Sequence, residues 1–130
     1  MYPQTCYRNT DLELKSPLSL SALCGEFAHS CHILHHTQDK EGNWCATIES
    51  SLVEDRTAAD DIQAMLAVIP TLTAAAQKQW NDCYFREFDL GFDCGDTWAY
   101  RHTLSLDIIQ AVAEANCSLS VTLYPPLEDG

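Results

Sequence analysis

Basic residues are scarce in this chain: seven lysines and arginines stand against nineteen aspartates and glutamates, which gives its 130 residues a formal net charge of −12. A chain this acidic excludes a conventional nucleic-acid binder, because such proteins use clustered basic side chains to displace counterions from phosphates. Long apolar runs are also missing, and none approaches the roughly 20 residues that span a bilayer. The start, Met1 to Cys6, lacks the basic and then apolar layout of a signal peptide. We therefore expect a cytoplasmic protein with neither a nucleic-acid nor a membrane partner.

The motifs that announce catalysis or cofactor binding are absent as well. The sequence has no Gly-rich phosphate loop, no dinucleotide fingerprint and no nucleophile elbow, and its seven cysteines include no C-x-x-C pair. The stretch 89–96 misses both the spacing and the closing glutamate of a calcium loop. An odd number of cysteines without a secretion signal favours reduced thiols that pack as small core residues. We therefore expect no cofactor and no catalytic residue, in a protein that is not an enzyme.

Hydrophobic patterning predicts a succession of strands and helices. Alternating residues and turn signals predict five strands, at 5–15, 31–37, 44–50, 83–94 and 117–124. Apolar residues at helical spacing predict four helical segments, at 19–28, 57–70, 71–80 and 105–116. Ser19, Thr57 and Ser105 are the predicted N-caps, and Thr57 with Asp60 resembles a capping box. Asn116, which tolerates a left-handed conformation, is the predicted end of the last helix. The turn formers at 39–43 predict a hairpin between the second and third strands.

These elements predict one α+β domain over residues 1–124, followed by a short C-terminal tail at 125–130. Their order is β-α-β-β-α-α-β-α-β. Alternating strands imply a sheet with one covered and one open face. We therefore expect a two-layer sandwich, in which an about five-stranded, mixed or mainly antiparallel sheet carries its helices on one face. The chain length and the 46% of hydrophobic residues fit a single core.

Residue types that bind metal ions are concentrated in the segment 29–36, which holds four of the five histidines and one thiol. On a strand, His32 and His36 share one side. Cys31 and His35 share the other, and side chains four residues apart lie about 13 Å from one another, too far to share one ion. The strand prediction therefore argues against a local site, and we expect no metal. A metal-binding or thiol-dependent protein centred on His29–His36 stays the alternative function, with the candidate ligands His29, Cys31, His32, His35, His36 and His102.

Negative charge is concentrated in the second part of the chain. Residues 1–48 hold five acids and three bases, whereas residues 49–130 hold fourteen acids and four bases. Two interpretations stay open: a solvated face that maintains solubility, or a docking surface for a basic protein. Aromatic residues near these acids would either anchor an interface or pin their loop to the core. The predicted partner-binding residues are Glu54, Asp55, Asp60, Asp61, Glu87, Asp89, Asp93, Asp96, Trp98 and Tyr100.

Three places in the sequence carry a family resemblance: Gly42-Asn43-Trp44 at the opening of a strand, the helix pair around Ala59 to Trp80, and Thr103-Leu104-Ser105-Leu106 before the last helix and the strand Leu119 to Tyr124. Together they resemble a bacterial family of domains of unknown function, number 4279 in that series, over most of the chain. The resemblance implies a small α+β domain and supplies no catalytic residue. This chain departs from that pattern in its many histidines and cysteines and in the long stretch 83–100.

Small, acidic, stand-alone bacterial proteins similar to that family often act as immunity factors, which neutralise a toxin made by the same cell. By this analogy we predict a non-enzymatic acidic binding protein, and most specifically an immunity-type inhibitor. Its acidic residues and exposed aromatic residues would occlude the basic active site of a cognate bacterial toxin domain. The sequence leaves the oligomeric state open.

Overall fold

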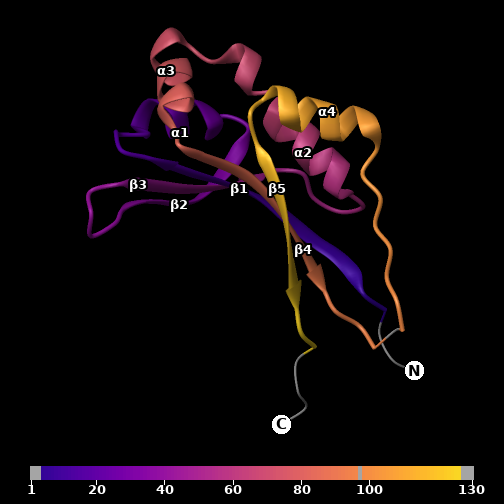
Figure 1. Cartoon of the computed structure of the whole chain (residues 1–130). Helices are drawn as coiled ribbons and strands as arrows, with labels where there is room; N and C mark the ends of the chain where they lie inside the picture. Colours follow the sequence, from indigo (N-terminus) through magenta and orange to yellow (C-terminus); the bar gives the residue numbers. More distant parts are fainter. Residues whose placement is uncertain (1–3, 97, 127–130) are drawn as a thin grey trace.

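Five strands form one sheet in the computed structural model, which describes residues 4–96 and 98–126 (Figure 1). In chain order they are β1 Cys6–Ser16, β2 Cys31–Gln38, β3 Trp44–Ser50, β4 Phe85–Asp93 and β5 Ser118–Tyr124. Their spatial order is β2-β3-β1-β4-β5, and neighbours are antiparallel except for the parallel pair of β4 and β5. The predicted mixed, mainly antiparallel sheet is confirmed, with the longest strand, β1, at its centre.

Four helices complete the described part of the fold. They are α1 Ser21–Phe27, α2 Ala58–Leu66, α3 Ala74–Asp82 and α4 Leu106–Glu114, with a 3-10 turn at Ile69–Thr71. The element order is the predicted one. Figure 1 shows the helices gathered at one side of the sheet, while the far ends of β4 and β5 extend beyond them. Over residues 4–96 and 98–126, no helix is long and apolar enough to cross a membrane.

The core lies between sheet and helices because the strand residues that face the helices are apolar. In α2, Ile62 and Met65 are completely buried and Leu66 packs at the edge of the core, as does Ile69 of the 3-10 turn, so the apolar stripe predicted at helical spacing is confirmed. Each fully buried side chain of this size contributes about 1.5–3 kcal/mol. The fully buried residues of the strands include Leu12, Leu14, Ile48 and Phe88.

Local capping signals place two of the helices where the sequence predicted them. The Thr57 hydroxyl accepts from the backbone N–H of Asp60, and the Asp60 carboxylate accepts from the backbone N–H of Thr57. This reciprocal pair is the predicted capping box of α2. The Ser105 hydroxyl likewise accepts from the N–H of Ile108 and caps α4. After α4, Asn116 takes a left-handed conformation with φ 61° and turns the chain toward β5.

Two helix boundaries differ from the prediction. The N-cap of α1 is Leu20 rather than Ser19, whose hydroxyl accepts from the N–H of Ser21 instead. The helix α2 ends at Leu66, before Pro70, and the chain then enters the 3-10 turn with Pro70 in its first positions. Proline is tolerated there because the first N–H groups of a helix have no partner within it. The helix predicted to extend to Pro70 therefore ends at Leu66, and a 3-10 turn follows it.

Candidate functional site

The open face of the sheet carries five carboxylates in two adjacent rows. In the first row, Asp11 of β1 lies directly between Glu49 of β3 and Asp89 of β4. In the second row, Glu13 of β1 lies beside Glu87 of β4. Strand alternation places all five on the side away from the helices, opposite the buried leucines of β1. We call these five residues the acidic face.

Among the described residues, neutral groups donate the hydrogen bonds that the carboxylates of the acidic face accept. The side-chain amide of Asn9 donates to Asp11 at 3.2 Å and to Glu49 at 3.0 Å. The hydroxyl of Thr47 donates to Glu13 at 2.8 Å. Within the described residues, none of the ion pairs involves the acidic face; the pairs are Arg8–Asp93, Arg56–Asp61 and Lys78–Asp82.

Partial burial, together with the crowding of the acidic face, raises the pKa of Asp11 from 3.8 to about 6. Partial burial is the largest cause, and the neighbouring carboxylates of Glu49 and Glu13 come next. Like charges directly opposite one another destabilise a pair of strands. Repulsion within the acidic face therefore lowers the free energy of unfolding as long as no cationic surface covers it.

Gly91 of β4 makes room for the amide that bridges two of these carboxylates. A Cβ at this position would lie 2.8 Å from the side-chain oxygen of Asn9 and 3.1 Å from the ring of Tyr124. Because real Cβ atoms do not approach other atoms that closely, a larger residue would displace the Asn9 side chain. The absence of a side chain at Gly91 therefore lets Asn9 lie over the strand and reach Asp11 and Glu49.

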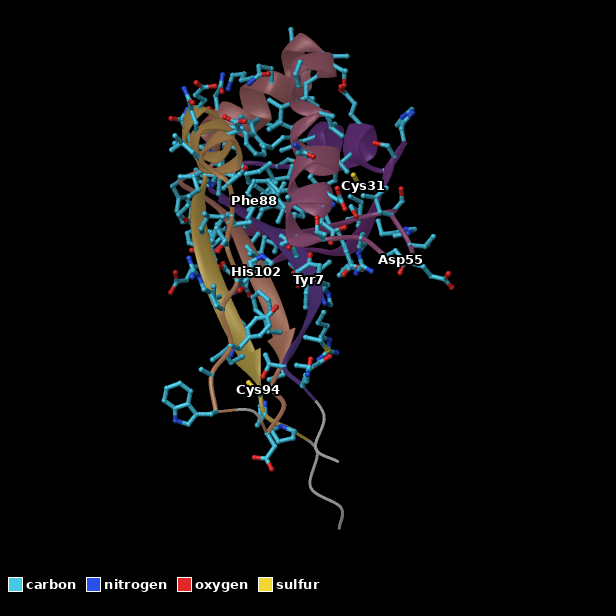
Figure 2. The ribbon with its side chains drawn as sticks, turned by 90° about the vertical axis from the view of Figure 1, so that its right-hand side faces the viewer. Tyr7, Cys31, Asp55, Phe88, Cys94 and His102 are labelled. Carbon is cyan, nitrogen blue, oxygen red and sulfur yellow. The ribbon has the colours of Figure 1, made fainter. Side chains whose placement is uncertain are left out.

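The fold separates the acidic residues that were predicted to bind a partner. Glu87 and Asp89 belong to the acidic face, whereas Asp93 and Asp96 are exposed at and beyond the end of β4. Glu54 and Asp55 are exposed in the loop between β3 and α2. Figure 2 shows Asp55 at the margin of the molecule. Asp60 is exposed but engaged in the capping box of α2.

Asp61 requires a correction, because it is completely buried and cannot meet a partner. The guanidinium Nε of Arg56 donates to both of its oxygens at 3.0 Å, and the hydroxyls of Tyr7 and Ser50 donate to it as well. Burial, followed by the hydrogen bond to Asp61, raises the pKa of Tyr7 above its usual value. Asp61 is therefore a structural anchor that ties α2 to β1, to β3 and to the preceding loop.

The two predicted aromatic anchors do not join the acidic face. The ring centroid of Tyr100 lies 5.5 Å from that of Phe92 and 6.5 Å from that of His102, so this residue packs against the helix side of β4. Figure 2 shows His102 beside Tyr7 on the same side, with 6.3 Å between their ring centroids. Trp98 is completely exposed. Of the two interpretations of Tyr100, the structure favours the one in which it pins its segment to the core.

The histidine-rich segment forms β2, with a bulge that changes the predicted pattern. The pairing of β2 with β3 slips by one residue between Ile33 and His35. The extra residue, Leu34, reverses the alternation, so that His32 and His35 face the open side while His36 faces the helices. The expectations that His32 shares a side with His36, and Cys31 with His35, are therefore both wrong.

The candidate metal ligands do not converge. Over residues 4–96 and 98–126, no group of three histidine, cysteine, aspartate or glutamate side chains could hold a metal ion. The ring of His36 lies 5.3 Å from that of Trp44, and its Nε2 is buried without a hydrogen-bond partner. Cys31 is buried, His29 is exposed after α1, and His102 packs on Tyr7. Within the described residues, the candidate ligands therefore lie apart.

The core role that the sequence predicted for the thiols is found for part of them: Cys24, Cys31 and Cys83 are buried and Cys117 packs against the core, whereas Cys45 and Cys94 are only half-buried. All seven cysteines lie in the described residues and are free. Burial raises the pKa of Cys24, Cys83 and Cys117 to about 11. Since the thiolate is the reactive form, these three remain protonated and inert at neutral pH. Cys6 is the exposed exception.

Sequence reasoning missed three members of the acidic face. Asp11 and Glu13 fall in the part of the chain that was counted as nearly neutral, and Glu49 directly follows it. One signal was present, since Asp11 and Glu13 alternate with buried leucines and must share the open side. Their closeness to Asp89 becomes visible only when β1 is placed between β3 and β4.

In comparisons with known proteins, no family model, no curated protein and no solved structure matches the chain. The resemblance to the bacterial family numbered 4279 stays a prediction.

Proposed function

We propose that this protein is a non-enzymatic binding protein that docks a basic protein surface on its acidic face. The observation that carries the proposal is the row formed by Glu49, Asp11 and Asp89, three adjacent carboxylates that no cation of the described residues neutralises. Lysines and arginines of a partner would relieve the repulsion that the free protein bears, and the complementary charge would also speed association.

The position of the acidic face supports docking over simple solvation. Its residues come from β3, β1 and β4, the three inner strands of the sheet. Their side chains are held by neutral hydrogen bonds, as Ser120 and Thr122 of β5 hold Asp89 at 3.1 and 2.8 Å. Half-buried, hydrogen-bonded carboxylates lose little further conformational freedom when a partner binds. Charged side chains that serve only solubility do not need to be fixed by hydrogen bonds.

The narrower form of the proposal is an immunity-type inhibitor that occludes the basic active site of a bacterial toxin. It is supported by the charge of the acidic face and by the predicted family resemblance. Toxin domains that act on nucleic acid present concentrated basic patches, because they must bind phosphates. A surface with five carboxylates in two rows offers such a patch several partners at once.

Two triple variants with the same change in net charge test the proposal. The face variant combines Glu13→Gln, Glu49→Gln and Asp89→Asn, whose amide oxygens still accept hydrogen bonds. The control variant combines Glu41→Gln, Glu54→Gln and Asp55→Asn, three exposed residues outside the acidic face. Asparagine suits position 55 because it tolerates the positive φ of 62° found there.

The first measurement is a calorimetric and NMR titration with an oligo-arginine peptide as the probe. We expect the face variant to bind the peptide at least about 10-fold more weakly than the wild type, and the control variant to lose less than about 3-fold. Wild-type chemical-shift changes should centre on the outward residues of β1, β3 and β4. Equal losses in both variants would reduce the effect to net charge and reject the proposal.

The second measurement addresses a natural partner. Wild type, face variant and control variant serve as baits for co-purification from the native host. A protein retained by the wild type and the control but lost by the face variant supports docking on the acidic face. If every retained protein survives in the face variant, docking on this surface is refuted.

A further inference from the structure

A second exposed surface lies on the helix side of the sheet, where the ends of β4 and β5 extend beyond the helices (Figures 1 and 2). There β4, β5, α4 and the segment 100–104 enclose a hollow of about 420 Å³. On β5, Val121 and Leu123 are 61% and 60% exposed, although they point to the same side as the core residues of β4. The hollow is mainly apolar, with Leu90, Phe92, Tyr100, Leu104, Ile109 and Val121 among its lining residues.

The backbone of β5 is also open along one side. The strand stands at the edge of the sheet. The N–H of Cys94 donates to the carbonyl of Tyr124 at 2.8 Å, so the backbone groups of Tyr124 face β4. Because successive residues of a strand alternate, Leu119, Val121 and Leu123 direct their N–H and C=O groups to the outer edge. An edge strand without charge or proline is a template for pairing with another strand.

The sequence of β5 is self-complementary. It is nearly palindromic about Val121, with Leu119 and Leu123 at equal distances on either side and Ser120 and Thr122 between them. A two-fold interface requires a surface that fits a second copy of itself. In an antiparallel pair centred on Val121, Leu119 of one copy lies opposite Leu123 of the other. The outward backbone groups then meet in register.

Electrostatic repulsion at this edge is small enough for two copies to approach, although the formal net charge of the chain is −12. The residues of β5 and those that line the hollow include no carboxylate, lysine or arginine. The acidic face lies on the other side of the sheet, and Asp89 on β4 is among its members nearest to β5. Pairing through β5 leaves the two β4 strands three strand spacings apart, about 14 Å. That separation exceeds the Debye length of roughly 8 Å at physiological salt.

The apolar surface is large enough for such an association. Helix α4, which packs on β5, adds the exposed Leu106 and Ile109. Taking roughly 120 Å² for a fully exposed side chain of this size, the six exposed apolar residues leave about 400 Å² open on each copy. A standard interface buries about 800 Å² per partner, somewhat more than half of it apolar. The six residues are Tyr100, Leu106, Ile109, Leu119, Val121 and Leu123.

We propose that two copies of this chain associate through antiparallel pairing of their β5 strands, which joins the two sheets and covers both hollows. The two-fold axis of such a pair is perpendicular to the sheet, so both acidic faces lie on the same side of the joined sheet. The association does not depend on the function proposed above. It uses the outer edge of β5 rather than the acidic face, although Ser120 and Thr122 of β5 also donate to Asp89.

Sedimentation of the full chain under reducing conditions tests the association, over about 1 to 300 µM at physiological salt. We expect a species of twice the 14.5 kDa chain mass to form as concentration rises. Val121→Lys should weaken the association at least about 10-fold, because it sets two lysines against each other at the axis. Val53→Lys is the matched control: Val53 is 76% exposed in a loop away from β5, and its variant should associate like the wild type.

Hydrogen exchange locates the contact. The amide protons of Leu119, Val121 and Leu123 should exchange more slowly as the concentration of the wild type rises, and those of Val121→Lys should not respond. A wild type that stays monomeric at about 300 µM overturns the proposal, as does a Val121→Lys variant that associates as tightly as Val53→Lys. The face variant must keep the association, which separates this test from that of the proposed function.

Discussion

Asp11 lies between two like charges, and its protonation is therefore linked to folding. Its pKa is about 6 in the folded chain against an ordinary value of 3.8, so the folded state holds the proton more tightly than the unfolded state does. Ionised Asp11 thus costs stability. The cost is absent below about pH 4, grows as pH rises toward 6, and is complete above that value.

Asp11→Asn should remove this cost. We expect the variant to be more stable than the wild type by about 1 kcal/mol near pH 7.5 and equal to it near pH 4, the full shift being reduced because Asp11 is only half buried. Urea unfolding at the two pH values measures the difference. The same gain at both pH values would show that the gain does not come from the cost of ionising Asp11, to which burial contributes most and repulsion from Glu49 and Glu13 next.

Single residues were predictable from the sequence where their partners are close along the chain. The Thr57 capping box and the Asn116 turn involve neighbours within three or four residues, and both are found. Asp61 was misjudged because its partner Tyr7 lies 54 residues away and no local pattern connects the two. An acid in the first turn of a helix has the same sequence signature whether it is exposed, as Asp60 is, or buried.

At the scale of elements, periodicity was sufficient for the order and type of all strands and helices. It failed where one residue changes the phase without changing the composition. At the bulge, the two apolar residues Ile33 and Leu34 follow one another in β2, and the pairing with β3 shifts by one residue. In the sequence, such a pair cannot be distinguished from a strand with one irregular position. The consequence is large, because a one-residue slip moves each later side chain of β2 to the other face.

The attachment of α2 to the sheet depends on the buried ion pair between Arg56 and Asp61. Arg56→Ala should destabilise the fold by about 3 kcal/mol, because it leaves a buried carboxylate without its counter-charge. Lys78→Ala is the matched control, since it removes an ion pair of similar length, 2.9 Å, at the surface of α3. Exposed pairs of this spacing contribute about 0.3–0.5 kcal/mol. Urea unfolding compares the two, and equal losses would contradict the anchoring role of Asp61.

At the scale of the whole molecule, the decisive fact is the sheet order, which no local pattern contains. Placing β1 between β3 and β4 assembles the acidic face from segments that lie up to 78 residues apart, such as Asp11 and Asp89. Counting acidic residues along the chain therefore identified only some members of the acidic face. It included Glu87 and Asp89 but missed Asp11, and it could not show that Tyr100 packs on the other side of the sheet.

This arrangement makes the stability of the molecule depend on salt. Raising NaCl from about 20 to about 300 mM shortens the Debye length and weakens repulsion among surface carboxylates, so the thermal unfolding midpoint of the wild type should rise by several degrees. The face variant should lose at least about half of that rise, because it removes three of five crowded charges. The control variant, with the same net charge, should keep most of it. Differential scanning calorimetry measures all three proteins. Equal salt responses in the two variants would show that repulsion is spread over the whole surface and is not concentrated on the open side of β1, β3 and β4.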